Sequence, residues 1–253
     1  MGLAHRVIPV LLTRHGYLVK GKQFNPARVV GSAQQAAEVH QARGVDELIV
    51  LDVAATPEGR GPDFKRMAKL TECCFMPVTV GGGISTVDHV RELLANGADK
   101  VVIGSAAVTN PNLIWECADK FGSQAIVVAI DSAITPLCRR RKIVSHCGTV
   151  NHALDALAFA EAIVSCGAGE LIVTSLCYDG MMRGYDLELV RDIASNVSVP
   201  VIANGGAGTY LHMHKALKAG ASAVAAGAMF QWTAQTPHGA AEYLAKKGWE
   251  MRI

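Results

Sequence analysis

Short apolar runs rich in β-branched residues alternate along the chain with longer stretches whose apolar positions recur every three or four residues. The short runs have the length of buried parallel strands, and the longer stretches have the spacing of amphipathic helices. Helices are predicted at residues 33–42, 86–96 and 186–195, with further helix starts at Asn110-Pro111 and Thr236-Pro237. Eight strands are predicted, at residues 6–12, 48–52, 78–80, 101–103, 126–131, 171–175, 201–203 and 224–226.

The sequence also repeats itself at one constant offset. GVDELIV at residues 44–50 matches GAGELIV at 167–173, and PVTVGGGIST at 77–86 matches PVIANGGAGT at 200–209. The repeat predicts an α/β fold, a single (β/α)₈ TIM barrel over residues 1–253 built from two duplicated half-barrels of about 1–122 and 123–253. A doubly wound open sheet is the alternative, but it does not predict two halves of four units each.

Composition narrows the class of protein. The chain is 50% hydrophobic, 18% charged and formally +2, which excludes a disordered tail and argues against a nucleic-acid partner. No run of 18 apolar residues exists, so we expect no membrane span. The seven cysteines form no CxxC pair, which favours free thiols and a cytoplasmic location. His212 and His214 are spaced to face apart on a helix, so we predict no metal, and nothing indicates a cofactor.

The longest connections follow the first and fifth predicted strands, at residues 13–32 and 132–152. Loops after strands form the active-site rim of a (β/α)₈ barrel, so we expect both at the functional mouth. The second contains the basic run at residues 139–142, which is typical of a solvated hairpin.

Glycine-rich segments follow the third and seventh strands, at residues 81–83 and 205–208, and each precedes a helix. Backbone amides at such a turn, aided by the helix N-terminus, can bind a phosphate. Small residues follow the fourth and eighth strands, at Gly104-Ser105 and Gly227-Ala228. Two such sites in equivalent halves predict a phosphorylated small molecule with a phosphate at each end.

Acidic residues end or follow several strands, and Asp52, Asp131 and Asp179 are therefore candidate acids or bases. The first strand ends instead in Leu11-Leu12, which cannot transfer a proton. At the opposite end of the barrel, charged residues begin four strands and would form a ring of two cations and two anions if they point inward: Arg6, Glu47, Lys100 and Glu170. Such a ring is either a salt-bridged plug or a gate for a small neutral molecule.

The ordered segments RVIPVLL, VDELIVLDVAAT, VTVGGGI, GADKVVIGSAAV and ANGGAG closely resemble the cyclase subunit of imidazole glycerol phosphate synthase, over residues 4–252. The resemblance implies a lyase of histidine biosynthesis that pairs with a glutaminase on the N-terminal barrel face and passes ammonia through the barrel. It places the ammonia gate at the four ring residues. It implies that, besides Asp52, substrate and phosphate contacts lie at Lys20, Gly83, Gly104, Ser105, Asp179, Gly180, Gly206, Gly227 and Ala228.

The chain departs from that family at the first of its two catalytic aspartates. Asp131 keeps the second, but Leu12 occupies the first. Losing a positioned acid or base typically costs 10²- to 10⁴-fold in rate, so we expect cyclase activity to be nearly absent. The chain is more similar to the paralogous branch found with N-sugar amidotransferases of bacterial surface polysaccharide synthesis. That resemblance implies an ammonia-channelling subunit of a glutamine-dependent amidotransferase, with an N-sugar amidotransferase as a further partner.

Three alternatives stay open at this stage. The first is a genuine cyclase of histidine biosynthesis in which another group replaces the missing aspartate. The second is the related single-chain isomerase of that pathway, which the ELIVLD segment and the four ring residues disfavour. The third is a non-catalytic scaffold whose charged ring is only a plug.

Overall fold

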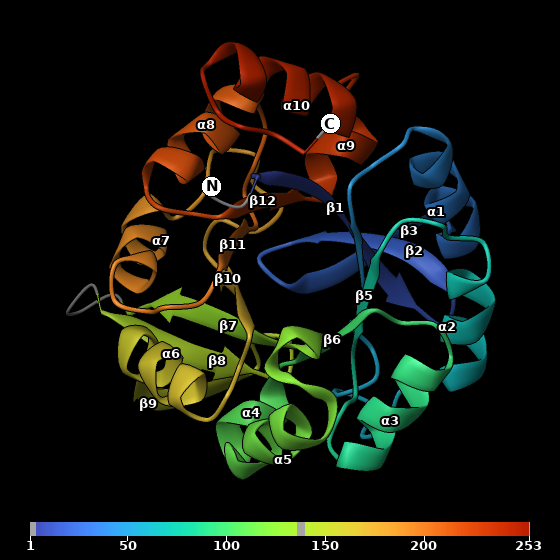
Figure 1. Cartoon of the computed structure of the whole chain (residues 1–253), viewed down its shortest axis with the longest axis vertical. Helices are drawn as coiled ribbons and strands as arrows, with labels where there is room; N and C mark the ends of the chain where they lie inside the picture. Colours follow the sequence, from blue (N-terminus) through green and yellow to red (C-terminus); the bar gives the residue numbers. More distant parts are fainter. Residues whose placement is uncertain (1–3, 136–139, 253) are drawn as a thin grey trace.

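In the computed structural model, which describes residues 4–135 and 140–252, the chain forms a closed barrel of eight parallel strands inside a ring of helices (Figure 1). The barrel strands are β1 (Arg6–Arg14), β4 (Leu48–Asp52), β5 (Val78–Gly81), β6 (Lys100–Ile103), β7 (Ile126–Ile134), β10 (Glu170–Ser175), β11 (Val201–Asn204) and β12 (Ala223–Ala226). The barrel closes because β1 pairs with both β4 and β12, while β10 pairs with both β7 and β11. The predicted (β/α)₈ fold is confirmed, and the duplication of its halves stays a prediction.

Each barrel strand sends alternate side chains to two different cores. On β1, Val7 and Leu11 pack outward beneath the helices, whereas Ile8 and Val10 point into the barrel. Because these strands are buried on both faces, their sequences are continuous apolar runs rather than alternating apolar and polar residues. The interior cluster holds small and branched residues from seven strands: Ile8, Val10, Ile49, Val102, Val127, Ile172, Ile202, Ala223 and Ala225, with Leu12, Leu51 and Ala129 packed at its edge.

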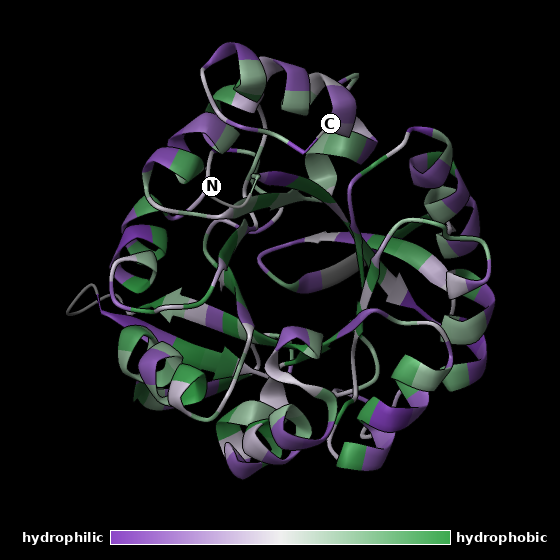
Figure 2. Cartoon of the chain, in the orientation of Figure 1, coloured by the Kyte–Doolittle hydropathy of each residue, from purple (hydrophilic) through white to green (hydrophobic). Residues whose placement is uncertain are grey.

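The helices cover the outside of the barrel and carry both hydrophilic and hydrophobic residues (Figure 2). Thr86 and Thr209 cap two of them, because each side chain accepts a hydrogen bond from the backbone N–H three residues ahead. These caps follow the two glycine-rich segments and fix where each helix begins. The helices are α1 (Ala33–Ala42), α2 (Phe64–Thr71), α3 (Val87–Ala95), α4 (Ser105–Thr109), α5 (Asn112–Phe121), α6 (Ala156–Ser165), α7 (Leu187–Ala194), α8 (Tyr210–Lys218), α9 (Ala228–Trp232) and α10 (Pro237–Lys246), with the short 3₁₀ helix η1 (Ser123–Ala125).

Two antiparallel hairpins extend from the barrel: the first stands where the sequence predicted only a long connection, and the second confirms the hairpin expected in the other long connection. The first consists of β2 (Tyr17–Lys22) and β3 (Asn25–Ser32) and continues from β1, and the second consists of β8 (Arg141–Ser145) and β9 (Val150–Asp155) and continues from β7. In Figure 1 the β2–β3 hairpin extends across the opening of the barrel. Their polar, glycine-containing sequences carry a weak strand signal, since the pairing depends on the ends of β1 and β7.

The basic run in the second hairpin is only partly solvated, so the prediction is wrong for Arg141. Arg139 lies outside the described residues. The Arg141 guanidinium donates from Nε and Nη2 to the two Asp186 carboxylate oxygens, at 2.9 and 2.8 Å, and its side chain is 17% exposed. Because Asp186 also caps α7, this forked pair ties the base of the β8–β9 hairpin to the next part of the barrel wall.

Candidate functional site

A cavity of about 580 Å³ opens at the carboxyl ends of the barrel strands, beneath the two hairpins. We call it the rim cavity. It brings together eight of the residues predicted from the sequence: Leu12, Lys20, Asp52, Gly83, Gly104, Ser105, Asp131 and Asp179. The other four predicted contacts, Gly180, Gly206, Gly227 and Ala228, lie outside the described lining of this cavity. The predicted residues therefore gather at one end of the barrel, but the residues of only one of the two expected anion sites line the described cavity.

Asp131 is a rim-cavity carboxyl whose surroundings favour its protonated form. It lies at the end of the parallel part of β7, and burial raises its pKa to about 7. The neighbouring Asp179 carboxyl adds to the rise in pKa, while a hydrogen bond from Thr174 opposes it. Thr174 also accepts a hydrogen bond of 3.1 Å from Asn204 Nδ2. A carboxyl that titrates near neutral pH can both give and take a proton under physiological conditions.

Lys20 and Asp179 form a second charged group in the rim cavity. Burial lowers the pKa of Lys20 to about 8, and Asp179 counteracts that fall. Burial raises the pKa of Asp179, against the opposing effects of Lys20 and of the backbone N–H groups of Phe24 and Gly180. The Gln23 N–H donates to the Asp179 backbone carbonyl at 2.9 Å. The β2–β3 hairpin is therefore held against the segment that follows β10.

Two glycines of the expected anion site at β11 and β12 leave no room for a side chain. A side chain at Gly227 would collide with Lys20 Nζ, and one at Gly206 would collide with the Gly184 carbonyl. By contrast, a Cβ at Gly104 would meet only Ala129, at an ordinary 3.7 Å. The rim cavity is therefore open at Gly104, whereas a Cβ at Gly83 would collide with the Arg60 carbonyl and one at Gly227 with Lys20 Nζ.

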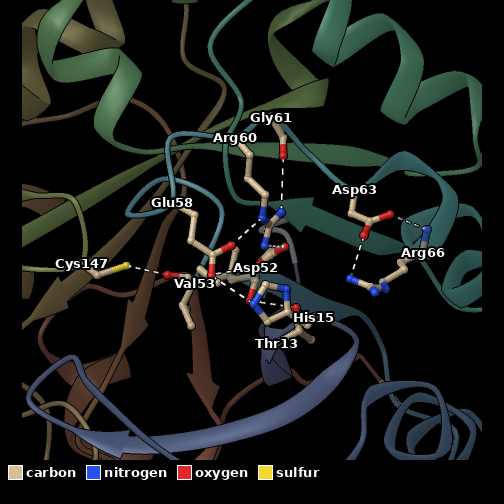
Figure 3. Close-up of polar contacts among 12 residues, drawn as sticks. Thr13, His15, Asp52, Val53, Glu58, Arg60, Gly61, Asp63, Arg66 and Cys147 are labelled. Atoms are coloured by element: carbon tan, nitrogen blue, oxygen red, sulfur yellow. Dashed lines mark hydrogen bonds and ion pairs between the residues drawn. The ribbon is translucent and has the colours of Figure 1, made fainter.

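Asp52 lies in the cavity wall but is already paired. Its two oxygens accept from Arg60 Nη2 at 2.8 Å and from the Ala54 N–H at 3.0 Å. Arg60 also bonds Glu58 at 2.8 Å, and Glu58 lies 3.0 Å from His15 Nε2, which makes a chain of polar contacts along the rim (Figure 3). Because both oxygens of Asp52 already accept from protein donors, the geometry favours a positioning role for this residue.

At the opposite end of the barrel, Arg6, Glu47, Lys100 and Glu170 form the closed set of ion pairs that the sequence predicted; we call it the charge ring. Arg6 bonds Glu47 at 2.5 Å and also bonds Glu170, while Lys100 lies 3.2 Å from Glu47 and 2.8 Å from Glu170. The glutamate side chains are only 4% and 6% exposed. Burial alone would raise the pKa of Glu47, but the two cations and a hydrogen bond from Thr79 outweigh burial, so the pKa lies below its ordinary value. Whether the charge ring acts as a gate stays a prediction.

Several lining residues were not predicted from the sequence. Thr174 and Asn204 line the cavity near Asp131, and His146 and Cys147 reach it from the turn of the β8–β9 hairpin. Thr174 lies one residue before the end of β10 and Asn204 ends β11, and both are in register with Asp131, a placement that could have singled them out. His146 and Cys147 had no such signal, because the expected hairpin did not specify which of its residues turn toward the cavity.

Metal and membrane sites have little support in the described part of the chain. No three His, Cys, Asp or Glu residues there are grouped as a metal would need. His212 Nδ1 accepts from the Gly208 N–H at 3.1 Å, whereas His214 Nδ1 accepts from Trp249 at 2.9 Å, so the two imidazoles have separate partners. Among residues 4–135 and 140–252, no helix has both the length and the apolar character to cross a bilayer.

Comparison with known families gives one match. The family model described as "Histidine biosynthesis protein" matches residues 6–235, which covers all eight barrel strands and both hairpins.

Proposed function

The chain belongs to the histidine biosynthesis protein family, and from that premise we propose that it is a barrel subunit that receives ammonia from a glutaminase and passes it on for amidation of a nucleotide-linked or surface-polysaccharide sugar. Its own cyclase activity is lost in this proposal. The observation that carries it is Leu12, which lines the rim cavity together with Asp131 while the charge ring at the other end is complete.

Leu12 is decisive because of where it lies. It occupies the inward-facing end of β1 and packs with Leu51 and Ala129 at the edge of the interior cluster. A carboxylate there would be the partner of Asp131 in a two-acid mechanism, whereas leucine offers the cavity only apolar surface. The described cavity lining retains acidic groups, but Asp52 is paired with Arg60 and Asp179 faces Lys20.

The N-terminal face offers features that fit a protein partner. The charge ring lies at this face, and Phe75, which stands between α2 and β5, is 88% exposed. An aromatic side chain that is exposed in the free protein is a frequent anchor of an interface. We therefore assign the glutaminase to this face, and the described interior between the charge ring and the rim cavity is lined by apolar side chains.

The test is an assay of the purified barrel with an ammonium salt in place of the glutaminase and the two-phosphate histidine intermediate as substrate. The wild type is expected to be silent, and Leu12→Asp is expected to gain activity of at least about 10²-fold. Leu12→Asn is the matched control, because it adds polarity of the same size without a group that transfers protons. A wild type that turns over at about 1 s⁻¹ or faster would return the protein to histidine synthesis as a cyclase.

A further inference from the structure

Three side chains of the β8–β9 hairpin form a hydrogen-bonded row that ends at the rim cavity. Ser145 Oγ lies 2.9 Å from His146 Nδ1 and 2.8 Å from His152 Nε2. Ser145 is only 3% exposed, His152 is half-buried, and His146 lines the rim cavity. A buried hydroxyl with an imidazole on each side connects the cavity to the outer part of the hairpin.

The backbone holds His146 in place at an unfavourable conformation. His146 and Cys147 have φ of +51° and +55°, in the left-handed region that glycine and asparagine adopt most easily. The His146 N–H donates to Ser105 Oγ at 2.9 Å, and the Cys147 thiol donates to the Val53 carbonyl at 3.1 Å. Because residues held this way concentrate at functional sites, the turn calls for a functional explanation.

We infer that His146 contacts an anionic, phosphorylated ligand at the open side of the rim cavity and exchanges a proton with it, while Ser145 and His152 position and recharge the imidazole. Imidazole is the side chain best suited to proton exchange near neutral pH. The His146 N–H is bonded to Ser105 Oγ, and both residues line the rim cavity together with Gly104. The inference rests on the proposed function only in taking the rim cavity as a ligand site.

The proton count is balanced along the row. Ser145 has one hydroxyl proton, so it donates to one imidazole and accepts from the other. With His152 protonated, His146 gives its Nε2 proton to a ligand oxygen, His146 Nδ1 takes the hydroxyl proton, and Ser145 Oγ takes the Nε2 proton of His152. The ligand gains one proton and His152 becomes neutral. The reverse sequence carries a proton from the ligand to His152.

Other titratable groups face the same cavity from β1, β2, β4, β7 and the segments after β4, β8 and β10: Arg14, Lys20, Asp52, Glu58, Asp131, Cys147 and Asp179. Lys20 faces Asp179, and both Asp52 and Glu58 bond Arg60. Burial raises the pKa of the Cys147 thiol to about 11, with Asp131 and Asp52 adding to the rise, so that thiol stays protonated at neutral pH.

The experiment is nitrogen-detected histidine NMR of the full chain, titrated with inorganic phosphate. Phosphate is expected to shift the His146 ring signals, and His146→Asn is expected to weaken phosphate binding roughly tenfold, as loss of one charged hydrogen bond does. Asparagine tolerates the left-handed backbone, so this variant should keep the turn. His238→Gln, at a 61% exposed side chain on α10, is the matched control and should leave phosphate binding unchanged.

Ser145→Ala tests the positioning role. The His146 and His152 signals are expected to respond together to pH in the wild type and independently in Ser145→Ala, a difference that a purely structural hydroxyl would not produce. Unchanged His146 signals on phosphate addition, or identical pH responses in both proteins, would overturn the inference. Neither measurement uses a glutaminase or cyclase assay, so this inference can fail while the Leu12→Asp result stands.

Discussion

Replacing Arg6 by methionine should destabilise the protein by about 3–5 kcal/mol, which is the usual cost of breaking a buried ion pair from one side. The magnitude follows from the geometry, because Arg6 bonds both glutamates of the charge ring. Glu47 and Glu170 are nearly buried, and the change leaves them sharing Lys100 alone. Methionine fills most of the space of the arginine stem, so the decrease in unfolding free energy measures the effect of the missing charge rather than of a cavity.

Urea unfolding at neutral pH measures this loss as a difference in unfolding free energy. Arg91→Met is the matched control, because that side chain is 56% exposed in a surface pair with Asp88 and should cost no more than about 1 kcal/mol. A loss below about 1 kcal/mol for Arg6→Met would refute the reasoning that the buried charges depend on each other.

The pH dependence of the Arg6→Met deficit provides a second check with a definite sign. In the wild type the pKa of Glu47 is below its ordinary 4.5, so its stabilisation is present above that pH and is lost as the pH falls. In Arg6→Met a buried glutamate has lost its main cation, so protonating it relieves the unpaired charge. The difference between the two proteins should therefore shrink as the pH falls toward 4.5. A difference that grows on acidification would contradict the argument.

Three further predictions concern the rim. Burial first and a neighbouring carboxyl second raise the pKa of Asp131 from 3.8 to about 7. The protonated group therefore stabilises the fold below pH 3.8, and that contribution is lost as the pH rises toward 7. Asp131→Asn should flatten the pH dependence of the unfolding free energy over this range, and an unchanged profile would contradict the prediction. Gly82→Ala should lower the unfolding free energy by at least about 1–3 kcal/mol, because φ is +114° and the new Cβ would collide with the end of β4. At Gly104 the nearest atom to a new Cβ is 3.7 Å away, so Gly104→Ala should change the unfolding free energy by no more than about 0.5 kcal/mol in the same urea assay. Arg141→Lys should lower stability by about 1–3 kcal/mol, since lysine cannot reproduce the forked contact with Asp186; a thermal unfolding curve that overlays the wild type would exclude this.

The barrel itself could be predicted because its strands are buried on both faces. Each predicted strand is present, and the largest extensions occur in β1 and β7, which continue beyond residues 12 and 131 into the hairpins. Those extensions could not be predicted, since antiparallel pairing at Thr13 with Leu18 and at Ser132 with Ile143 depends on neighbours that local pattern does not reveal.

The candidate site was predictable where chemistry follows strand ends and less so where it depends on side-chain partners. The ring of Arg6, Glu47, Lys100 and Glu170 could be predicted, because all four residues stand at the starts of strands. The pairing of Asp52 with Arg60 could not, because Arg60 lies in an irregular segment after β4. Nor could the occupation of the space at Gly227 by Lys20, which depends on how the first hairpin folds back over the barrel.

The two hairpins also bear on how fast a ligand can leave. One extends from β1 and is held by Gln23 to the backbone of Asp179, while the other extends from β7 and is held by His146 to Ser105. A molecule seated beneath both must wait for a hairpin to move, and these movements typically take microseconds to milliseconds. The Gln23 side chain also donates from Nε2 to the Cys177 carbonyl at 3.4 Å, so we expect Gln23→Ala to shorten the residence time of a bound molecule more than it alters the rate of association. The hairpins would then determine how fast a ligand exchanges, while the barrel residues determine which ligand binds.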